Sequence, residues 1–236
     1  MNNVRLTFKE SITRTESVTS FRFVPEEPIL FEPGQFLQLL FDENNKNNKE
    51  LNKYLSFSCA PGKEYVEVTK RLSLSMFSER LRSLRPGACV LAVAPLGNCV
   101  FKDDYAKIGF LIGGIGITPV ISIIEYIIMK KLSTDVCLLY SNRRENDIAF
   151  KKELTQWRKA HSTFRIVFTV TDCEPVDQLC MVGFISRETI ISHMVDWKDR
   201  VIFVFGPPAM VNGLKYLCHD LSCDPAKIKT ENFLGY

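Results

Sequence analysis

Residues 108–128, IGFLIGGIGITPVISIIEYII, constrain the fold of this chain more than any other segment. Their length and apolar composition suit a helix that crosses a bilayer. Their glycines and proline suit instead a strand buried on both faces, then a tight turn and a helix start. Glu125 favours the second structure, because a carboxylate in the middle of the segment would be costly in lipid. We therefore predict a soluble strand–turn–helix unit and no membrane span.

The turn in this segment has the composition of a phosphate-binding site. Gly113, Gly114 and Gly116 allow positive φ and a close approach of ligand to backbone. Thr118 is expected to cap the helix, and Pro119 suits its first turn, where a missing N–H costs nothing. The unpaired amides at a helix start face outward and attract anions. The sequence thus predicts that this turn holds the phosphates of a nucleotide.

The overall composition is that of a globular protein and excludes several other classes. The 236 residues are enough for two modest domains or one large domain. A net charge of +3 is too small to indicate nucleic-acid binding. The start of the chain lacks the apolar region of a signal peptide. The eight cysteines form no C-x-x-C pair, which predicts free thiols, no metal site and a cytoplasmic location.

The pattern of the chain changes near residue 102. Before it, short alternating runs lie between turn residues, which favours an antiparallel barrel or sandwich. A helix is predicted at residues 76–84, and the Asn- and Lys-rich residues 42–53 are expected to form a mobile loop. We predict that residues 1–101 and 102–236 form two domains.

The second half alternates apolar strands with helical patterns. The helices are expected after Thr118, Asp147, Ser186 and Pro207. Such alternation predicts a parallel sheet with helices on both faces. One strand ends in Gly206-Pro207-Pro208, at the sheet edge where α/β proteins bind ligands, although a plain strand–turn–helix joint would have the same residues.

The order of the motifs resembles the ferredoxin–NADP⁺ reductase superfamily. The segments that carry the resemblance are KYLSFSCAP, SLSMFSERLRSLRPG, APLGNCVF, LIGGIGITPV, LLYSNRRENDIAF, VFGPPAMV and ENFLGY. The resemblance implies an FAD-binding antiparallel barrel followed by a Rossmann-like NAD(P)-binding domain. It implies a flavoprotein reductase that moves hydride from NAD(P)H to N5 of FAD. The electrons would pass to a separate acceptor: a ferredoxin- or flavodoxin-like protein, an oxygenase or a small molecule.

The resemblance also assigns a flavin site in the barrel. The family motif R-x-Y-S-x-x-S aligns with residues 53–59, so Ser56 would hydrogen-bond near the flavin N5. Lys53 replaces the arginine that holds the pyrophosphate. Leu55 replaces the stacking aromatic, unless a shift of register gives that role to Tyr54. The further positions implied to contact FAD are Lys70, Arg71, Ser75, Met76, Phe77 and Ser78.

In the second domain the resemblance places the NAD(P)H pyrophosphate at the glycine turn and the nicotinamide beside Gly206 and Pro207. Phe205 stands where many relatives have a cysteine. Arg143 could hold the 2′-phosphate of NADPH, whereas Asp172 would repel it. These charges point both ways, and we favour NADH.

The last residues resemble the closing strand of the family. Glu231 would lie near the flavin, and the terminal Tyr236 would shield its ring, unless that end is frayed in solvent. Ser56, Glu231 and Tyr236 form the predicted catalytic set. Two other functions stay open: a flavin-bearing electron-transfer subunit of a larger complex, and a degenerate nucleotide-binding module without activity.

Overall fold

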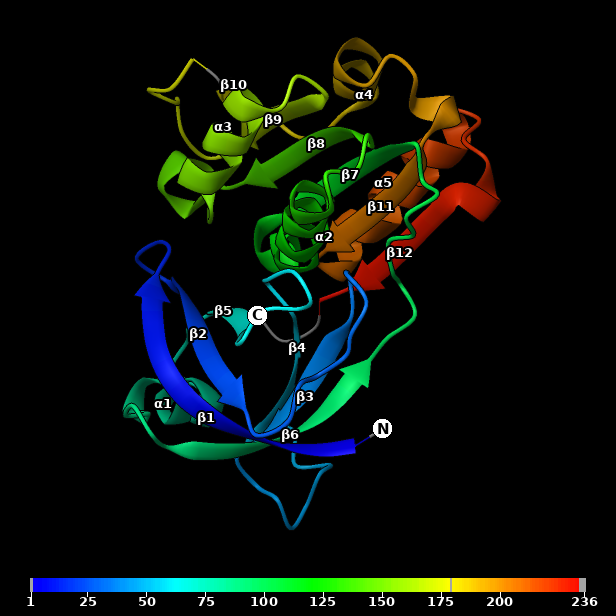
Figure 1. The fold of residues 1–236 in the computed structure, drawn as a ribbon. Coiled ribbons are helices and arrows are strands. Elements are labelled where there is room, and N and C mark those ends of the chain that lie inside the picture. The colour runs from blue at the N-terminus through cyan, green and yellow to red at the C-terminus, as the bar shows by residue number, and fades with distance from the viewer. Residues whose placement is uncertain (1, 179, 234–236) are drawn as a thin grey trace. The chain divides into compact units, whose positions relative to one another are not determined.

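The computed structural model describes residues 2–178 and 180–233 (Figure 1). The contacts between residues divide the chain into two compact units. Of the described residues, one unit contains 2–101 and 118–130, and the other contains 102–117, 131–178 and 180–233.

The first unit contains a six-stranded antiparallel sheet with the order β4-β3-β6-β1-β2-β5. A bridge between Phe57 and Val68 joins its two ends, so the sheet closes into the predicted barrel. The strands are β1 (Asn2–Thr13), β2 (Val18–Pro25), β3 (Phe36–Leu40), β4 (Asn52–Ser56), β5 (Val66–Arg71) and β6 (Cys89–Leu96). Inward-facing side chains such as Phe21 and Phe23 form its core.

Helix α1 (Met76–Ser83) forms where the sequence predicts it. The hydroxyl of Ser75 accepts a hydrogen bond from the amide of Ser78 and so caps the helix. Phe77 and Leu81 lie on one face of α1 and pack into the barrel core. The helix is therefore held by its apolar face as well as by its cap.

The second sheet has six strands, all parallel, in the order β10-β9-β8-β7-β11-β12. The strands are β7 (Lys107–Gly113), β8 (Asp135–Asn142), β9 (Phe164–Val170), β10 (Cys180–Val182), β11 (Val201–Gly206) and β12 (Ile228–Asn232). The helices after residue 102 are α2 (Ile117–Lys130), α3 (Lys151–Ala160), α4 (Arg187–His193) and α5 (Pro208–Asp220), and residues 118–130 of α2 belong to the first unit. Residues of α4 and α5, among them Ile190 and Val211, share a core with Leu139 and Val204 of the sheet.

Residues 108–128 form no single helix: they run from β7 through the 3₁₀ turn η1 (Gly114–Gly116) into α2. No helix of the described residues is long and apolar enough to cross a membrane. Helix α2 begins at Ile117, so the expectation that Thr118 caps it is wrong. The 3₁₀ turn leads directly into the helix and leaves Thr118 inside the first turn.

The polar loop is shorter than predicted, because β4 already begins at Asn52. The side chain of Asn52 donates hydrogen bonds to the carbonyls of Asp42 and Asn45. The Asp42 carboxylate accepts hydrogen bonds from Asn45 and Asn48. These contacts tie the two ends of the loop together.

Candidate functional site

The two predicted glycine turns of the second half meet at one edge of the parallel sheet. Strand β7 lies between β8 and β11, so the strand order reverses there, and the carboxyl ends of β7 and β11 flank the switch point (Figure 1). A Cβ on Gly206 would lie 3.3 Å from the amide nitrogen of Gly113. The backbone of the Gly206-Pro207 turn thus touches that of the Gly113–Gly116 turn, which forms the crevice where such sheets bind ligands.

The glycines of this crevice have different surroundings. A Cβ on Gly116 would lie 2.5 Å from the carbonyl oxygen of Phe205, and one on Gly113 would collide with the Met210 side chain. Gly114 has a φ of +52°, and a Cβ there would point into open space. The hydroxyl of Tyr140 donates a hydrogen bond of 2.9 Å to the Gly114 carbonyl, which fixes the turn. The open space at Gly114 fits a nucleotide phosphate.

Pro119 lies in the first turn of α2, as predicted, and the neighbouring Thr118 is buried. No acidic side chain lies in this first turn. The anion-attracting end of the helix is therefore not neutralised by its own residues.

Two lysines of the barrel form a positively charged pair. Lys53 lies on the same face of β4 as the core residue Leu55, and Lys70 lies on the same face of β5 as the core residue Val68. Burial and the charge of Lys53 lower the pKa of Lys70. In the part of the chain that the structure describes, neither lysine has an ion pair. Two cations without a counter-charge fit a pyrophosphate.

The other predicted flavin residues of β4 differ in exposure. Tyr54 is 65% exposed and places the edge of its ring against Phe36, with centroids 5.8 Å apart. Leu55 and Ser56 are buried. The aromatic surface that this strand offers to a ligand is therefore that of Tyr54.

The residues around the start of α1 are used partly by the protein itself. Arg71 donates a hydrogen bond of 3.3 Å to the Ser17 hydroxyl. The Ser75 and Ser78 hydroxyls bond each other at 3.1 Å, and Phe77 packs in the barrel core. Met76 is exposed. Contacts of Phe77 with a cofactor are thus limited to its backbone.

Glu231 is a titratable residue of the second unit whose carboxyl is mostly buried. It pairs with Phe205 in the register of β11 and β12, and the ring of Phe205 also contacts that of Phe233. Its Oε2 is buried and has no hydrogen-bond partner among residues 2–178 and 180–233. Burial raises the pKa of the Glu231 carboxyl to about 7. This carboxyl can therefore hold or release a proton near neutral pH. Tyr236 lies outside the described residues.

Arg143 and Asp172 meet at the ends of β8 and β9. The Asp172 amide donates a hydrogen bond of 2.8 Å to the Arg143 carbonyl, and the Asp172 carboxylate accepts one of 2.7 Å from the Thr171 hydroxyl. Asp172 and Arg143, which are predicted to have opposite effects on NADPH binding, therefore lie at the same corner of the sheet.

Two groups at this sheet edge were not predicted from the sequence. Met210 of α5 packs against Gly113, and the side chain of Asn142 is buried without a hydrogen-bond partner from any described residue. The sequence GPPAM could have predicted a role for Met210 at this edge, because it places an apolar residue in the first turn of the helix that follows β11. A single asparagine between a serine and an arginine carries no such signal.

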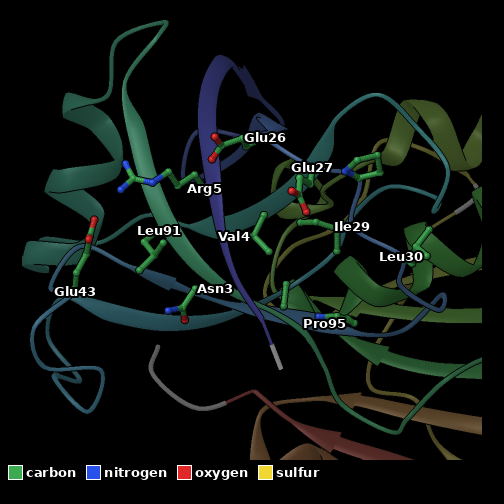
Figure 2. Close-up of a pocket in the computed structure, with 12 residues that line it drawn as sticks. Asn3, Val4, Arg5, Glu26, Glu27, Ile29, Leu30, Glu43, Leu91 and Pro95 are labelled. Carbon is green, nitrogen blue, oxygen red and sulfur yellow. The ribbon is translucent and has the colours of Figure 1, made fainter.

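Figure 2 shows a surface cavity of about 700 Å³ on strands β1 and β6. Its lining combines the carboxylates of Glu26 and Glu27 with Arg5 and the apolar Ile29 and Leu91. None of the predicted site residues lines it. We therefore do not assign this cavity to flavin or nucleotide.

Comparisons with known proteins agree with this geometry. Residues 110–215 match the oxidoreductase NAD-binding domain family. NADH-cytochrome b5 reductase 1 of Ajellomyces capsulatus is 30% identical over 219 residues, which cover 88% of this chain and 70% of that protein. NADH-cytochrome b5 reductase 1 of Aspergillus terreus is 29% identical over 231 residues, 93% of this chain and 78% of that protein.

Solved structures share the whole fold. The flavohem-like FAD/NAD-binding domain of nitric oxide dioxygenase from Vibrio cholerae superposes with a TM-score of 0.85 at 18% identity, covering 99% of both chains. A ferredoxin NADP⁺ reductase from Neisseria gonorrhoeae gives a TM-score of 0.82 at 19% identity, covering 98% of this chain and 99% of that one. The chain therefore belongs to the ferredoxin–NADP⁺ reductase superfamily, as a flavoprotein oxidoreductase that uses FAD and a nicotinamide nucleotide and is related to the NADH-cytochrome b5 reductases.

Proposed function

We propose that this chain transfers electrons from NADH to a small haem protein of the cytochrome b5 kind. FAD, when bound, supplies the chemistry that accepts a hydride and releases electrons. The observation that carries the proposal is the match to NADH-cytochrome b5 reductases over 93% of the chain. Asp172 supports NADH as donor, because a carboxylate at the end of β9 opposes the extra phosphate of NADPH.

The residues of each unit have separate tasks in this proposal. In the second unit the open backbone at Gly114 binds the nucleotide phosphates, and Glu231 holds a proton near neutral pH. In the first unit Lys53 and Lys70 hold the flavin phosphates, and Ser56 hydrogen-bonds the flavin ring.

The surface charge of α1 supports an anionic acceptor. Arg80 and Arg82 are exposed on this helix, and Arg85 is exposed just after it. Haem carries two propionate carboxylates, so such a basic surface would attract a haem edge and speed its encounter at low salt.

The test is an anaerobic titration of the FAD-loaded protein with NADH and with NADPH, followed by oxidised cytochrome b5. We expect NADH to bleach the flavin at lower concentration and the cytochrome to be reduced at a rate that falls with ionic strength. The variant R80E/R85E should reduce the cytochrome more slowly than the wild type does. Its rate of reduction of an uncharged quinone should be unchanged. A flavin that NADH bleaches and quinone reoxidises, but that does not reduce the cytochrome, would refute the acceptor while leaving the donor assignment intact.

The described cysteines are all free thiols. They support a reducing compartment, and we propose a cytoplasmic location. Recovery of the protein with the membrane or secreted fraction of cells would contradict it.

A further inference from the structure

The side-chain amide of Asn142 is buried and unsatisfied. Asn142 is the last residue of β8 and is 6% exposed. Both its Oδ1 and its Nδ2 lack a hydrogen-bond partner among the described residues. A buried amide without partners destabilises the folded protein, so its presence at a ligand-binding edge requires an explanation.

The orientation of β8 places this amide beside the glycine turn. Side chains two residues apart on a strand point to the same face, so Asn142 shares a face with Tyr140. The Tyr140 hydroxyl reaches the Gly114 carbonyl at 2.9 Å, which identifies this face as the one that carries the turn. Asn142 lies one step farther, at the carboxyl edge itself and one strand away from β7. A nucleotide whose phosphates lie at Gly114 would pass this amide on its way toward β9.

We propose that Asn142 is a specificity residue for the nucleotide and that its amide recognises the adenine ring. An amide presents a donor and an acceptor side by side in one plane, and adenine presents the complementary pair at N6 and N7. Both groups are neutral, which suits a buried position where a charge would be costly. The inference concerns the electron donor and is independent of the acceptor proposed above.

Thr169 provides a matched control. Its Oγ1 is also buried and has no partner in the part of the chain that the structure describes, with 1% of the residue exposed. The β8–β9 register pairs Thr169 with Ser141, whereas Asn142 pairs with Val170. Thr169 therefore points to the opposite face of the sheet, the face of Val167 and Leu139. It shares the burial and the missing partner of Asn142 but faces away from the glycine turn.

The experiment compares Asn142→Leu and Thr169→Val in the FAD-loaded protein. Calorimetric titration measures the Kd of NAD⁺ and of nicotinamide hypoxanthine dinucleotide, which has an acceptor in place of the adenine N6 donor. Without nucleotide, both variants should melt at a higher temperature than the wild type, because each loses an unsatisfied polar group. Only N142L should weaken NAD⁺ binding, by about 10- to 100-fold. The wild type should prefer NAD⁺ to the hypoxanthine analogue, and N142L should bind both alike.

Stopped-flow reduction by NADH adds a second readout. The apparent Kd for NADH should rise in N142L while the limiting rate of flavin reduction stays unchanged, because adenine is remote from the reacting carbon. Unchanged NAD⁺ affinity in N142L would overturn the proposal. An equal loss of affinity for both dinucleotides in N142L would also overturn it, because the amide would then contact the ribose and not the base. If N142L does not fold, Asn142→Ser takes its place, and wild-type preference for NAD⁺ in that variant would overturn the proposal equally.

Discussion

Replacing Glu231 with glutamine should stabilise the folded protein at neutral and alkaline pH but not in acid. Burial beside Phe205 raises the carboxyl pKa from 4.5 to about 7. At about 1.4 kcal/mol per pKa unit, the ionised carboxylate then destabilises the folded state by at most about 3.5 kcal/mol. A carboxyl whose pKa rises on folding retains its proton in the folded protein where the unfolded chain has lost it. The stability of the wild type should therefore fall as pH rises from 4.5 to about 7.

The assay is urea unfolding of wild type and E231Q between about pH 4.5 and 8.5, at one fixed FAD concentration because bound ligand adds stability. The difference in unfolding free energy should grow through this window and level off above about pH 7. Glu188→Gln is the control of opposite sign. Hydrogen bonds from its own backbone amide and from Ser186 lower the pKa of Glu188. E188Q should therefore be less stable than the wild type at neutral pH and equally stable in acid. A difference between E231Q and wild type that does not change with pH would refute the burial argument.

Four further predictions test other parts of the site. Gly116→Ala should destabilise the protein by about 1–3 kcal/mol in urea unfolding, because its Cβ would meet the Phe205 carbonyl at 2.5 Å. Gly114→Ala should cost about 1 kcal/mol through its φ of +52° and should mainly weaken NAD⁺ binding measured by calorimetry. Lys53→Met should raise the Kd of FAD about tenfold, measured by the fluorescence of released flavin, and should also raise the pKa of Lys70. Asp172→Ala should improve the ratio of kcat/KM for NADPH over NADH roughly tenfold, equivalent to about 1.4 kcal/mol of charge repulsion.

The fold was predictable because its signals are local. Ser186 caps α4 through the Thr189 amide, and Pro208 occupies the first position of α5. The apolar runs of β7, β8, β9 and β11 are buried along nearly their whole length, as expected for strands covered on both faces. The strand β10, with three residues, is too short to leave a periodic pattern.

The properties of the site residues depend on long-range pairing and were not predictable. Lys53 and Lys70 influence each other only because β4 and β5 come together where the barrel closes. The pKa of Glu231 is raised because the β11–β12 register places the residue beside Phe205, where it is buried. No feature of the ENFLGY segment specifies that register. The unpaired amide of Asn142 likewise results from the position of β8 in the sheet.

The glycine turn itself illustrates how one motif combines two physical requirements. Gly116 is needed because β11 approaches so closely that a side chain would strike the Phe205 carbonyl, and Gly113 because Met210 occupies the space of a Cβ. Both glycines therefore serve the packing of the switch point, whatever ligand is bound. Gly114 faces open space, so only a ligand or the backbone conformation can explain its lack of a side chain. If this division is right, G116A should lose stability and affinity together, whereas G114A should lose affinity out of proportion to its stability.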